Sequence, residues 1–119
     1  MRDRKVDGVV LKKIIDYCTD IESFITRADA SYEMYQSDAM FRTAVDMCVL
    51  QIGELTTRLS DEFKAQHAEI PWRAIKAMRN VLVHEYEKVN LEDAWKNLAR
   101  DVPELKTQLE HILAAEARQ

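Results

Sequence analysis

Glycine and proline are scarce in this chain of 119 residues, which contains two of each. The tight turns of sheet proteins draw heavily on both residue types, so their scarcity argues against a β-rich fold. Alanine, leucine, glutamate, lysine and methionine are common instead, and these residues favour helices. The length suits one domain, and nothing marks a second core. We therefore expect residues 1–119 to form a single all-α domain.

Long apolar runs are also absent. No stretch approaches the ~18 consecutive apolar residues that a membrane-spanning helix requires. The start of the chain, MRDRKVDG, contains no apolar core of the kind that follows the charged end of a signal peptide. Both absences predict a protein that stays in the cytoplasm.

The chain contains only two cysteines. Cys18 and Cys48 fall on apolar helix faces, and two cysteines make neither a disulfide framework nor a zinc site. We expect both in the core as small hydrophobic residues, and we expect no metal or other cofactor.

The formal net charge of -4 counts against a protein that coats nucleic acid through bulk electrostatics. Any RNA binding must therefore come from a local patch.

Apolar residues recur on one face in four segments, at steps of three or four residues in most places, as amphipathic helices require. The stretch SDEFKAQH, between the second and third of these segments, could add a short helix, whereas residues 28–37 read as a connection. Four amphipathic helices with short connections predict a bundle. The four helices are expected at about residues 6–28, 38–59, 72 to 86 or 88, and 91–112.

Particular residues mark where these helices begin or bend. Ser37 or Asp38 can cap the second helix, and Asn90 the last, by accepting bonds from backbone N–H groups. Pro71 suits the first position of the third helix because its missing N–H would be unpaired there anyway. Pro103 predicts a kink in the last helix.

The third helix concentrates residue types that carry chemistry. Arg79, Asn80, His84 and Tyr86 lie within two turns of one another. Residues 79–86, RNVLVHEY, have the form R-x-x-x-x-H-x-Y with a polar residue after the arginine. This octapeptide resembles the signature of the HepT toxins within the HEPN superfamily. The likeness covers most of the chain from about residue 44 onward, with IGEL at 52–55, IPW at 70–72, MRN at 78–80 and W…DVPEL at 95–105 in matching order.

The resemblance implies an endoribonuclease with a HEPN four-helix bundle. Such proteins work as homodimers in which the two copies of the motif face each other across a cleft. The catalytic pair would be Arg79 and His84. Family members commonly act with an MntA-type nucleotidyltransferase antitoxin, which neutralises the toxin by attaching AMP to the motif tyrosine, here Tyr86. The expected partners are therefore an RNA substrate, this antitoxin and a second copy of the chain.

These residue types suit RNA cleavage without a metal ion. RNA carries its own nucleophile, the ribose 2′-hydroxyl, so the reaction requires a base for its proton and positive charge for the developing phosphorane. An imidazole such as His84 exchanges protons near neutral pH, and the planar guanidinium of Arg79 suits bidentate contact with a phosphate. We expect a 2′,3′-cyclic phosphate product. The sequence leaves open whether His84 acts as base, as acid or in turn as both.

Helix geometry separates the two catalytic candidates. At ~3.6 residues per turn, positions 79 and 84 lie roughly 140° apart around the axis, whereas 79 and 86 differ by about 20°. Three arrangements would still unite Arg79 and His84: a helix that ends or distorts near His84, an Arg79 side chain that reaches around, or a site that mixes two subunits. We favour the shared dimer cleft. Asn80, one turn before His84, could support it by a hydrogen bond to the imidazole ring.

Some residues near the motif have structural alternatives. Gly53, inside the second helix, costs about 1 kcal/mol relative to alanine, which suggests close approach by a neighbouring helix. The adjacent Glu54 is the candidate to pair with Arg79 and orient it. Arg73 and Lys76, about two turns and one turn before Arg79, form either a solvated helix face or a guide for RNA phosphates.

The tyrosines and the two histidines outside the motif pair also have structural explanations. Tyr86 is either a core residue with its hydroxyl at the rim or an exposed AMP acceptor. His67 and His111 are expected on the surface. Tyr32 and Tyr35 lie in the first connection, where no role can be argued for them.

Two other functions compete with a ribonuclease. One is a non-catalytic HEPN subunit that serves as the binding partner of a nucleotidyltransferase. The intact pair of Arg79 and His84 favours the enzyme over that subunit. The other is a helical interaction protein with no nucleic-acid role, which would require the whole motif to be a coincidence.

Overall fold

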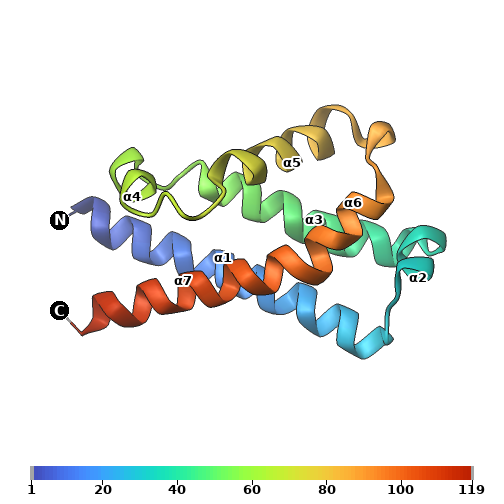
Figure 1. Cartoon of the computed structure of the whole chain (residues 1–119), viewed down its shortest axis with the longest axis horizontal. Coiled ribbons are helices and arrows are strands. Elements are labelled where there is room, and N and C mark those ends of the chain that lie inside the picture. Colours follow the sequence, from blue (N-terminus) through green and yellow to red (C-terminus); the bar gives the residue numbers. More distant parts are fainter. Residues whose placement is uncertain (1, 119) are drawn as a thin grey trace.

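The molecule is a bundle of helices. Its structure, a computed structural model, describes the backbone of residues 2–118 and the side chains of residues 6–118. Three of the long segments are α1 (Arg2–Ala28), α3 (Ala39–Thr56) and α5 (Trp72–His84), and the fourth joins α6 (Leu91–Lys96), η2 (Asn97–Asp101) and α7 (Val102–Ala117). The short helices α2 (Tyr32–Ser37), α4 (Asp61–Gln66) and η1 (Tyr86–Lys88) lie in the connections (Figure 1). No strand occurs in residues 2–118, so the predicted all-α bundle is confirmed.

The core lies where α1 packs against α3 and α7. Leu11, Ile14 and Ile21 of α1 are completely buried there, together with apolar residues of the other two helices. Cys18 and Cys48 are buried free thiols within this core, as predicted. Helix α5 packs mainly against α3, so α3 lies between the core and the helix that carries the motif (Figure 1).

Residues 28–37 are not only a connection, because they contain the helix α2. Ser31 caps it, since its hydroxyl accepts a bond from the backbone N–H of Met34, at 3.4 Å. At the other end, Arg42 donates to the carbonyl groups of Tyr35 and Gln36, at 2.9 and 2.7 Å. These carbonyls belong to the last turn of α2. Carbonyl groups in the last turn of a helix have no N–H partner within the helix, so Arg42 supplies one. A helix of six residues is too short to show an apolar period, so the sequence pattern missed it.

The boundaries of α3 and α5 differ from the prediction. Asp38 caps α3 as expected, by accepting from the backbone N–H of Phe41 at 3.0 Å, but α3 ends at Thr56 rather than at residue 59. Pro71 stands just before α5, in the capping position, and not at the first helical position. The indole of Trp72 fixes the start of α5, because it donates to the carbonyl group of His67 at 3.0 Å.

The last segment bends where proline interrupts it. Asn90 caps α6 as predicted, by accepting from the backbone N–H of Asp93 at 3.1 Å. The π-helical segment η2 follows, and in it the N–H of Val102 donates to the carbonyl of Asn97, five residues back. Pro103 has no N–H to continue the α-helical ladder, and its ring crowds the preceding turn. The irregularity predicted at Pro103 therefore takes the form of this widened turn.

None of the helices described between residues 2 and 118 is both long enough and apolar enough to cross a membrane.

Candidate active site

Arg79 is positioned by the close contact between α5 and α3. A Cβ atom placed on Gly53 would lie 2.8 Å from Cγ of Arg79, and closer still to its Cβ. Such distances are too short for carbon atoms, so only glycine fits at residue 53 while Arg79 keeps this position. The close approach predicted from Gly53 is therefore present, and the neighbour it admits is the motif arginine.

Two side chains hold the guanidinium of Arg79. Its Nε atom donates to Glu54 in an ion pair, and one Nη atom donates to the side-chain oxygen of Asn80 at 2.9 Å. The side chain of Arg79 is 27% exposed, so the group is oriented without being enclosed. The pairing expected between Arg79 and Glu54 is present. The side chain of Asn80 accepts a hydrogen bond from Arg79. The bond expected between Asn80 and the ring of His84 is absent among residues 6–118, so that prediction is wrong.

Arg73, Lys76, Asn80 and His84 follow one another along α5 at steps of three, four and four residues. They consequently share one face of the helix. The two basic residues and His84 are exposed, and Asn80 is partly exposed. Among residues 6–118, none of the basic residues in this row pairs with a carboxylate. We call these four residues the basic row.

The guanidinium of Arg79 reaches the basic row although its backbone lies on another side of α5. Arg79 and His84 both lie within the α-helical residues 72–84, so the roughly 140° between their positions stands. The bond from Arg79 to Asn80 nevertheless brings the guanidinium to a residue one turn before His84. Of the three arrangements considered for the pair, this bond supports the one in which Arg79 reaches around the helix, and the helix also ends at His84, as the first arrangement required.

The helix does not continue through Tyr86, contrary to the prediction. Helix α5 ends at His84, and Glu85 has φ -140° and ψ 39°, outside the helical region. Residues 86–88 form the separate 3₁₀ turn η1. Arg79 and Tyr86 therefore do not share a helix face. Beyond the helix, the side chain of Tyr86 contacts α3.

That contact is a hydrogen bond to a buried carboxylate. Tyr86 donates to Oδ2 of Asp46 at 2.9 Å, and Tyr35 donates to Oδ1 of the same carboxylate at 2.7 Å. Tyr35 is fully buried and Asp46 is 6% exposed, whereas Tyr86 is 44% exposed. Tyr86 is thus partly open to solvent, with its hydroxyl at the edge of the bundle. We call Tyr35, Asp46 and Tyr86 the tyrosine–aspartate cluster.

Burial dominates the ionisation of this cluster. It raises the pKa of Asp46 above its usual value, against the opposing effect of the two tyrosine hydroxyls and of Arg42. It also raises the pKa of Tyr35 and of Tyr86, and the neighbouring carboxylate raises both further. The two phenols therefore stay protonated and act as donors.

No role for Asp46 or Tyr35 was predicted from the sequence, because their partners are far apart in the chain. Tyr35 is 11 residues before Asp46, and Tyr86 is 40 residues after it. One signal was available: Asp46 precedes Gly53 by seven residues, or two helical turns, so it lies on the face of α3 that α5 approaches.

The other two histidines differ from each other. His111 is exposed, as predicted. His67 is not a plain surface residue, because its side chain is only 24% exposed and its ring packs against Phe63 with centroids 4.6 Å apart. Phe63 belongs to the short helix α4, and His67 follows this helix as its C-cap residue, with a backbone carbonyl that accepts from the indole of Trp72.

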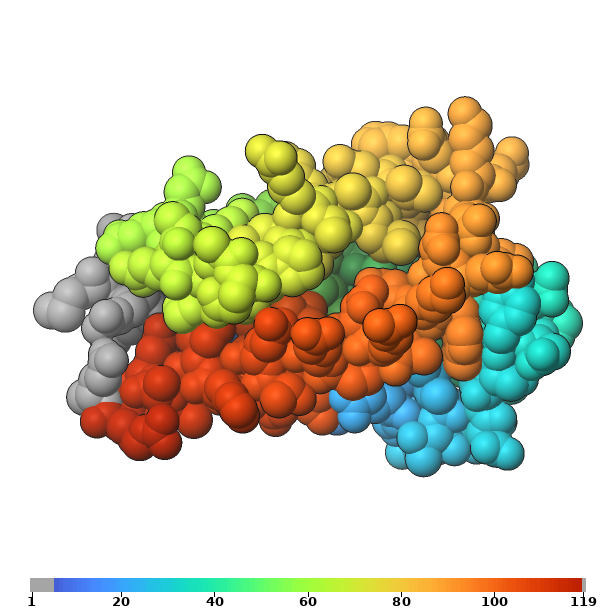
Figure 2. Space-filling model, in the orientation of Figure 1, coloured from blue at the N-terminus to red at the C-terminus, as the bar shows by residue number. Residues whose placement is uncertain are grey.

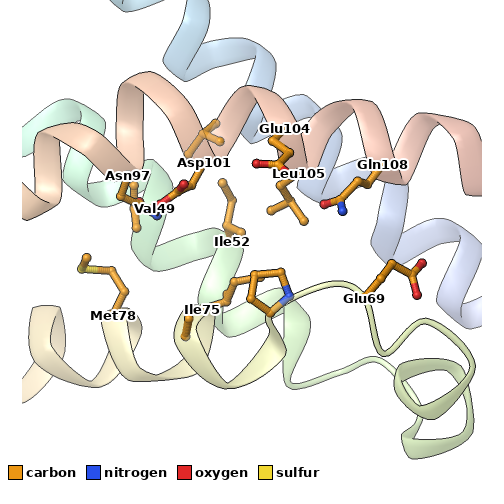
Figure 3. Close-up of a pocket in the computed structure, with 13 residues that line it drawn as sticks. Val49, Ile52, Glu69, Ile75, Met78, Asn97, Asp101, Glu104, Leu105 and Gln108 are labelled. Atoms are coloured by element: carbon orange, nitrogen blue, oxygen red, sulfur yellow. Dashed lines mark hydrogen bonds between the residues drawn. The ribbon is translucent and has the colours of Figure 1, made fainter.

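A groove lies on another side of α5, between this helix and α7. Its volume is about 420 Å³, with Val49, Ile52, Ile75, Met78 and Leu105 among its apolar residues. Glu69, Asp101 and Glu104 lie along its edge (Figure 3). Figure 2 shows α3 at the floor of the hollow between the yellow α5 and the orange α7. Neither Arg79 nor His84 lines this groove, so it is separate from the motif.

The motif therefore presents a held guanidinium and an open imidazole along one helix. The guanidinium can contact the oxygens of a phosphodiester, and an exposed imidazole can exchange a proton with water or substrate. In the part of the chain that the structure describes, no three His, Cys, Asp or Glu side chains are grouped to hold a metal ion.

Comparison with known proteins agrees with the motif. The family model described as "Ribonuclease HepT-like" matches residues 14–112. A protein of Caldanaerobacter subterraneus subsp. tengcongensis, provisionally named an RNase, is 34% identical over 107 residues, which cover 89% of this chain and 93% of that relative. A protein of Thermococcus cleftensis named a probable ribonuclease HepT is also 34% identical, over 103 residues that cover 82% of this chain and 93% of the relative. No solved structure gives a significant match. The match to the family model over most of the chain, with the motif residues on α5 inside it, shows that this protein belongs to the HepT-like ribonuclease family.

Proposed function

We propose that this protein is the endoribonuclease toxin of a HEPN and nucleotidyltransferase pair, acting in the cytoplasm. The observation that carries the proposal is the arrangement around Arg79. Glu54 and Asn80 orient its guanidinium beside the exposed face that carries His84. The relatives named as ribonucleases support the same activity.

The proposed reaction is an internal transesterification of RNA. The ribose 2′-oxygen attacks the adjacent phosphorus, and the bond from phosphorus to the 5′-oxygen breaks. The products are a 2′,3′-cyclic phosphate and a 5′-hydroxyl. Arg79 stabilises the charge on the non-bridging oxygens, and His84 exchanges the proton that leaves the nucleophile or joins the leaving group. No step requires a metal ion.

The basic row supplies the RNA contacts in this proposal. Arg73 and Lys76 are exposed and lie about three and two turns before His84 on the same face. Their charges attract RNA phosphates locally, although the chain as a whole carries a formal charge of -4.

The active unit in this proposal is a homodimer with a shared cleft. The backbone positions of Arg79 and His84 lie about 140° apart on α5, and His84 is exposed. A second copy related by a two-fold axis would place its own basic row opposite the first. Each phosphate would then meet arginine and histidine from the two sides of the cleft.

Tyr86 is the proposed target of an MntA-type nucleotidyltransferase antitoxin. Tyr86 is 44% exposed and lies two residues beyond His84, so a partner enzyme can reach it beside the proposed catalytic groups. An attached AMP would add bulk and negative charge where an RNA phosphate must bind. Both effects oppose cleavage.

The test is RNA cleavage by unmodified protein in excess chelator. Total RNA and tRNA are incubated with wild type, with an Arg79→Ala, His84→Ala double variant and with His111→Ala as a matched histidine control. We expect cleavage by wild type and His111→Ala, with cyclic phosphate ends, and none by the double variant.

Two results would contradict the proposal. Equal inertness of wild type and the double variant, with both folded and dimeric, would favour the non-catalytic partner of a nucleotidyltransferase. Cleavage that stops in chelator and returns with a divalent cation would contradict the metal-independent reaction.

A further inference from the structure

Asp46 is an unusual residue to bury in this bundle. It is 6% exposed, and within residues 6–118 it pairs with no cation. Removing a carboxylate from water is costly unless its hydrogen bonds are satisfied, and an apolar residue of similar size would avoid that cost. What the carboxylate provides is a fixed pair of acceptors for the hydroxyls of Tyr35 and Tyr86.

The two tyrosines contribute differently to this arrangement. Tyr35 is fully buried in α2, and its ring lies 5.7 Å from that of Trp95. Its hydroxyl therefore fixes the carboxylate of Asp46 from the inside. The other carboxylate oxygen is then aimed at Tyr86, which is the only member of the cluster that reaches the surface.

The bond from Tyr86 to Asp46 fixes the chain immediately after His84. Before His84 the backbone is held by α5, and the N–H of Glu85 still donates to the carbonyl of Val81 at 2.8 Å. After Glu85 the chain is held by Tyr86. His84 itself is exposed, and its side chain makes no hydrogen bond among the described residues. The position of its imidazole thus depends on the backbone on either side.

We propose that Asp46, held by Tyr35, anchors Tyr86 and thereby sets the position of the imidazole of His84. Asp46 and Tyr35 are then positioning residues of the ribonuclease. Tyr86 has a role in the unmodified chain as well as being the target of modification. The inference rests on the proposed function, since it concerns the same reaction.

The anchor also explains how a nucleotide on Tyr86 would act. Attachment forms a bond between the tyrosine oxygen and the α-phosphorus of ATP, breaks the bond from that phosphorus to pyrophosphate and releases the hydroxyl proton. The oxygen of Tyr86 can then no longer donate to Asp46. The new phosphodiester charge also lies near the buried carboxylate, which repels it. The turn that follows His84 is released, in addition to the blockage of the cleft.

The anchor can be tested by removing single hydroxyl groups. Tyr86→Phe removes the bond at the rim with little risk to folding, and Tyr32→Phe is its matched control in the same fold. In residues 6–118 the hydroxyl of Tyr32 has no hydrogen-bond partner in the structure. Asp46→Leu removes both acceptors, and the Asp46→Leu, Tyr86→Phe double variant tests whether the two changes act through one bond.

We expect Tyr86→Phe to lower kcat for RNA cleavage about 10- to 100-fold with little change in KM, since small displacements of a catalytic group have effects of this size. The double variant should cleave no worse than Asp46→Leu, and Tyr32→Phe should match wild type. The melting temperature of Tyr86→Phe should fall by only about 5 °C.

The ring-proton NMR signals of the three histidines provide a readout that general destabilisation would not produce. Tyr86→Phe should shift or broaden the signal of His84 and leave those of His67 and His111 unchanged. Wild-type cleavage matched by Tyr86→Phe, or an unmoved His84 signal, would overturn the anchor while leaving the ribonuclease intact. A wild type that cleaves no RNA would overturn the proposed function and the positioning role with it.

Discussion

Replacement of Gly53 by alanine tests the contact on which Arg79 depends. In most helices this change is favourable, because alanine stabilises a helix interior by about 0.8–1.0 kcal/mol relative to glycine. At residue 53 the new Cβ would lie 2.8 Å from Cγ of Arg79 and closer to its Cβ. The atoms it meets belong to the start of the side chain, next to the backbone of α5, so they cannot move away without moving the helix or changing the rotamer.

The magnitude follows from two opposing contributions. Overpacking of a tight contact costs about 1–3 kcal/mol, and the helix preference of alanine returns about 1 kcal/mol. Gly53→Ala should therefore lower the free energy of unfolding by up to about 2 kcal/mol. Gly8, inside α1, provides the matched control because among the described residues nothing lies within 4 Å of its added Cβ. Gly8→Ala should raise the stability by up to about 1 kcal/mol.

The assay compares both variants in urea unfolding and in RNA cleavage. The helix preference is common to both, so the difference between them, about 1–3 kcal/mol, measures the clash with Arg79. Gly53→Ala should also lose cleavage activity about 10- to 100-fold, because the guanidinium is displaced from Glu54. If Gly53→Ala were as stable and as active as Gly8→Ala, the close contact would have no part in placing Arg79.

Three further predictions follow from the structure. Arg79→Ala and His84→Ala chains are mixed in equal amounts and allowed to exchange subunits. If each site takes its arginine and its histidine from different copies, roughly a quarter of wild-type cleavage should return. Continued inactivity of the exchanged dimers would place both residues of a site in one chain. Burial raises the pKa of Asp46 from 3.8, so its contribution to stability is complete below that pH and is lost as the pH rises through the higher folded value. The stability of wild type relative to Asp46→Asn should therefore fall as the pH rises above 3.8, and a constant or rising difference would contradict the direction of the shift. Burial also raises the pKa of Cys18 to about 12 and that of Cys48 to about 11, so both thiols should resist a disulfide reagent near pH ~8 until the protein is unfolded, and rapid native labelling would contradict their placement in the core.

The long helices were predictable because each buries a continuous apolar face. The stripes on α1, α3 and α7 recur over several turns, and Asp38 and Asn90 mark two helix starts in the way that capping residues do. Gly53 was informative for a similar reason: a glycine inside a helix is unfavourable locally, so it points to a neighbour. The pairing of Glu54 with Arg79 followed from it.

The end of α5 was not predictable from the local sequence. Residues 84–89 contain no glycine or proline, and Val89 continues the apolar pattern, so nothing nearby stops the helix. The chain leaves the helix at Glu85, and Tyr86 then bonds to Asp46, 40 residues earlier. A side-chain bond of this separation has no signature in local periodicity. For the same reason the role of Asp46 itself went unseen.

Helix α3 serves as the template on which the motif is arranged. Its two acidic residues, Asp46 and Glu54, are eight residues apart, which corresponds to about 12 Å along the helix. Glu54 holds Arg79 near one end of the motif, and Asp46 holds Tyr86 at the other. The order of these contacts shows that α3 and α5 run in opposite directions. His84 lies between the two held residues in sequence and has no hydrogen bond of its own among the described side chains. A change in α3 should therefore alter cleavage without touching RNA, because α3 contacts Arg79 directly and, in the proposed anchor, positions His84 through Tyr86.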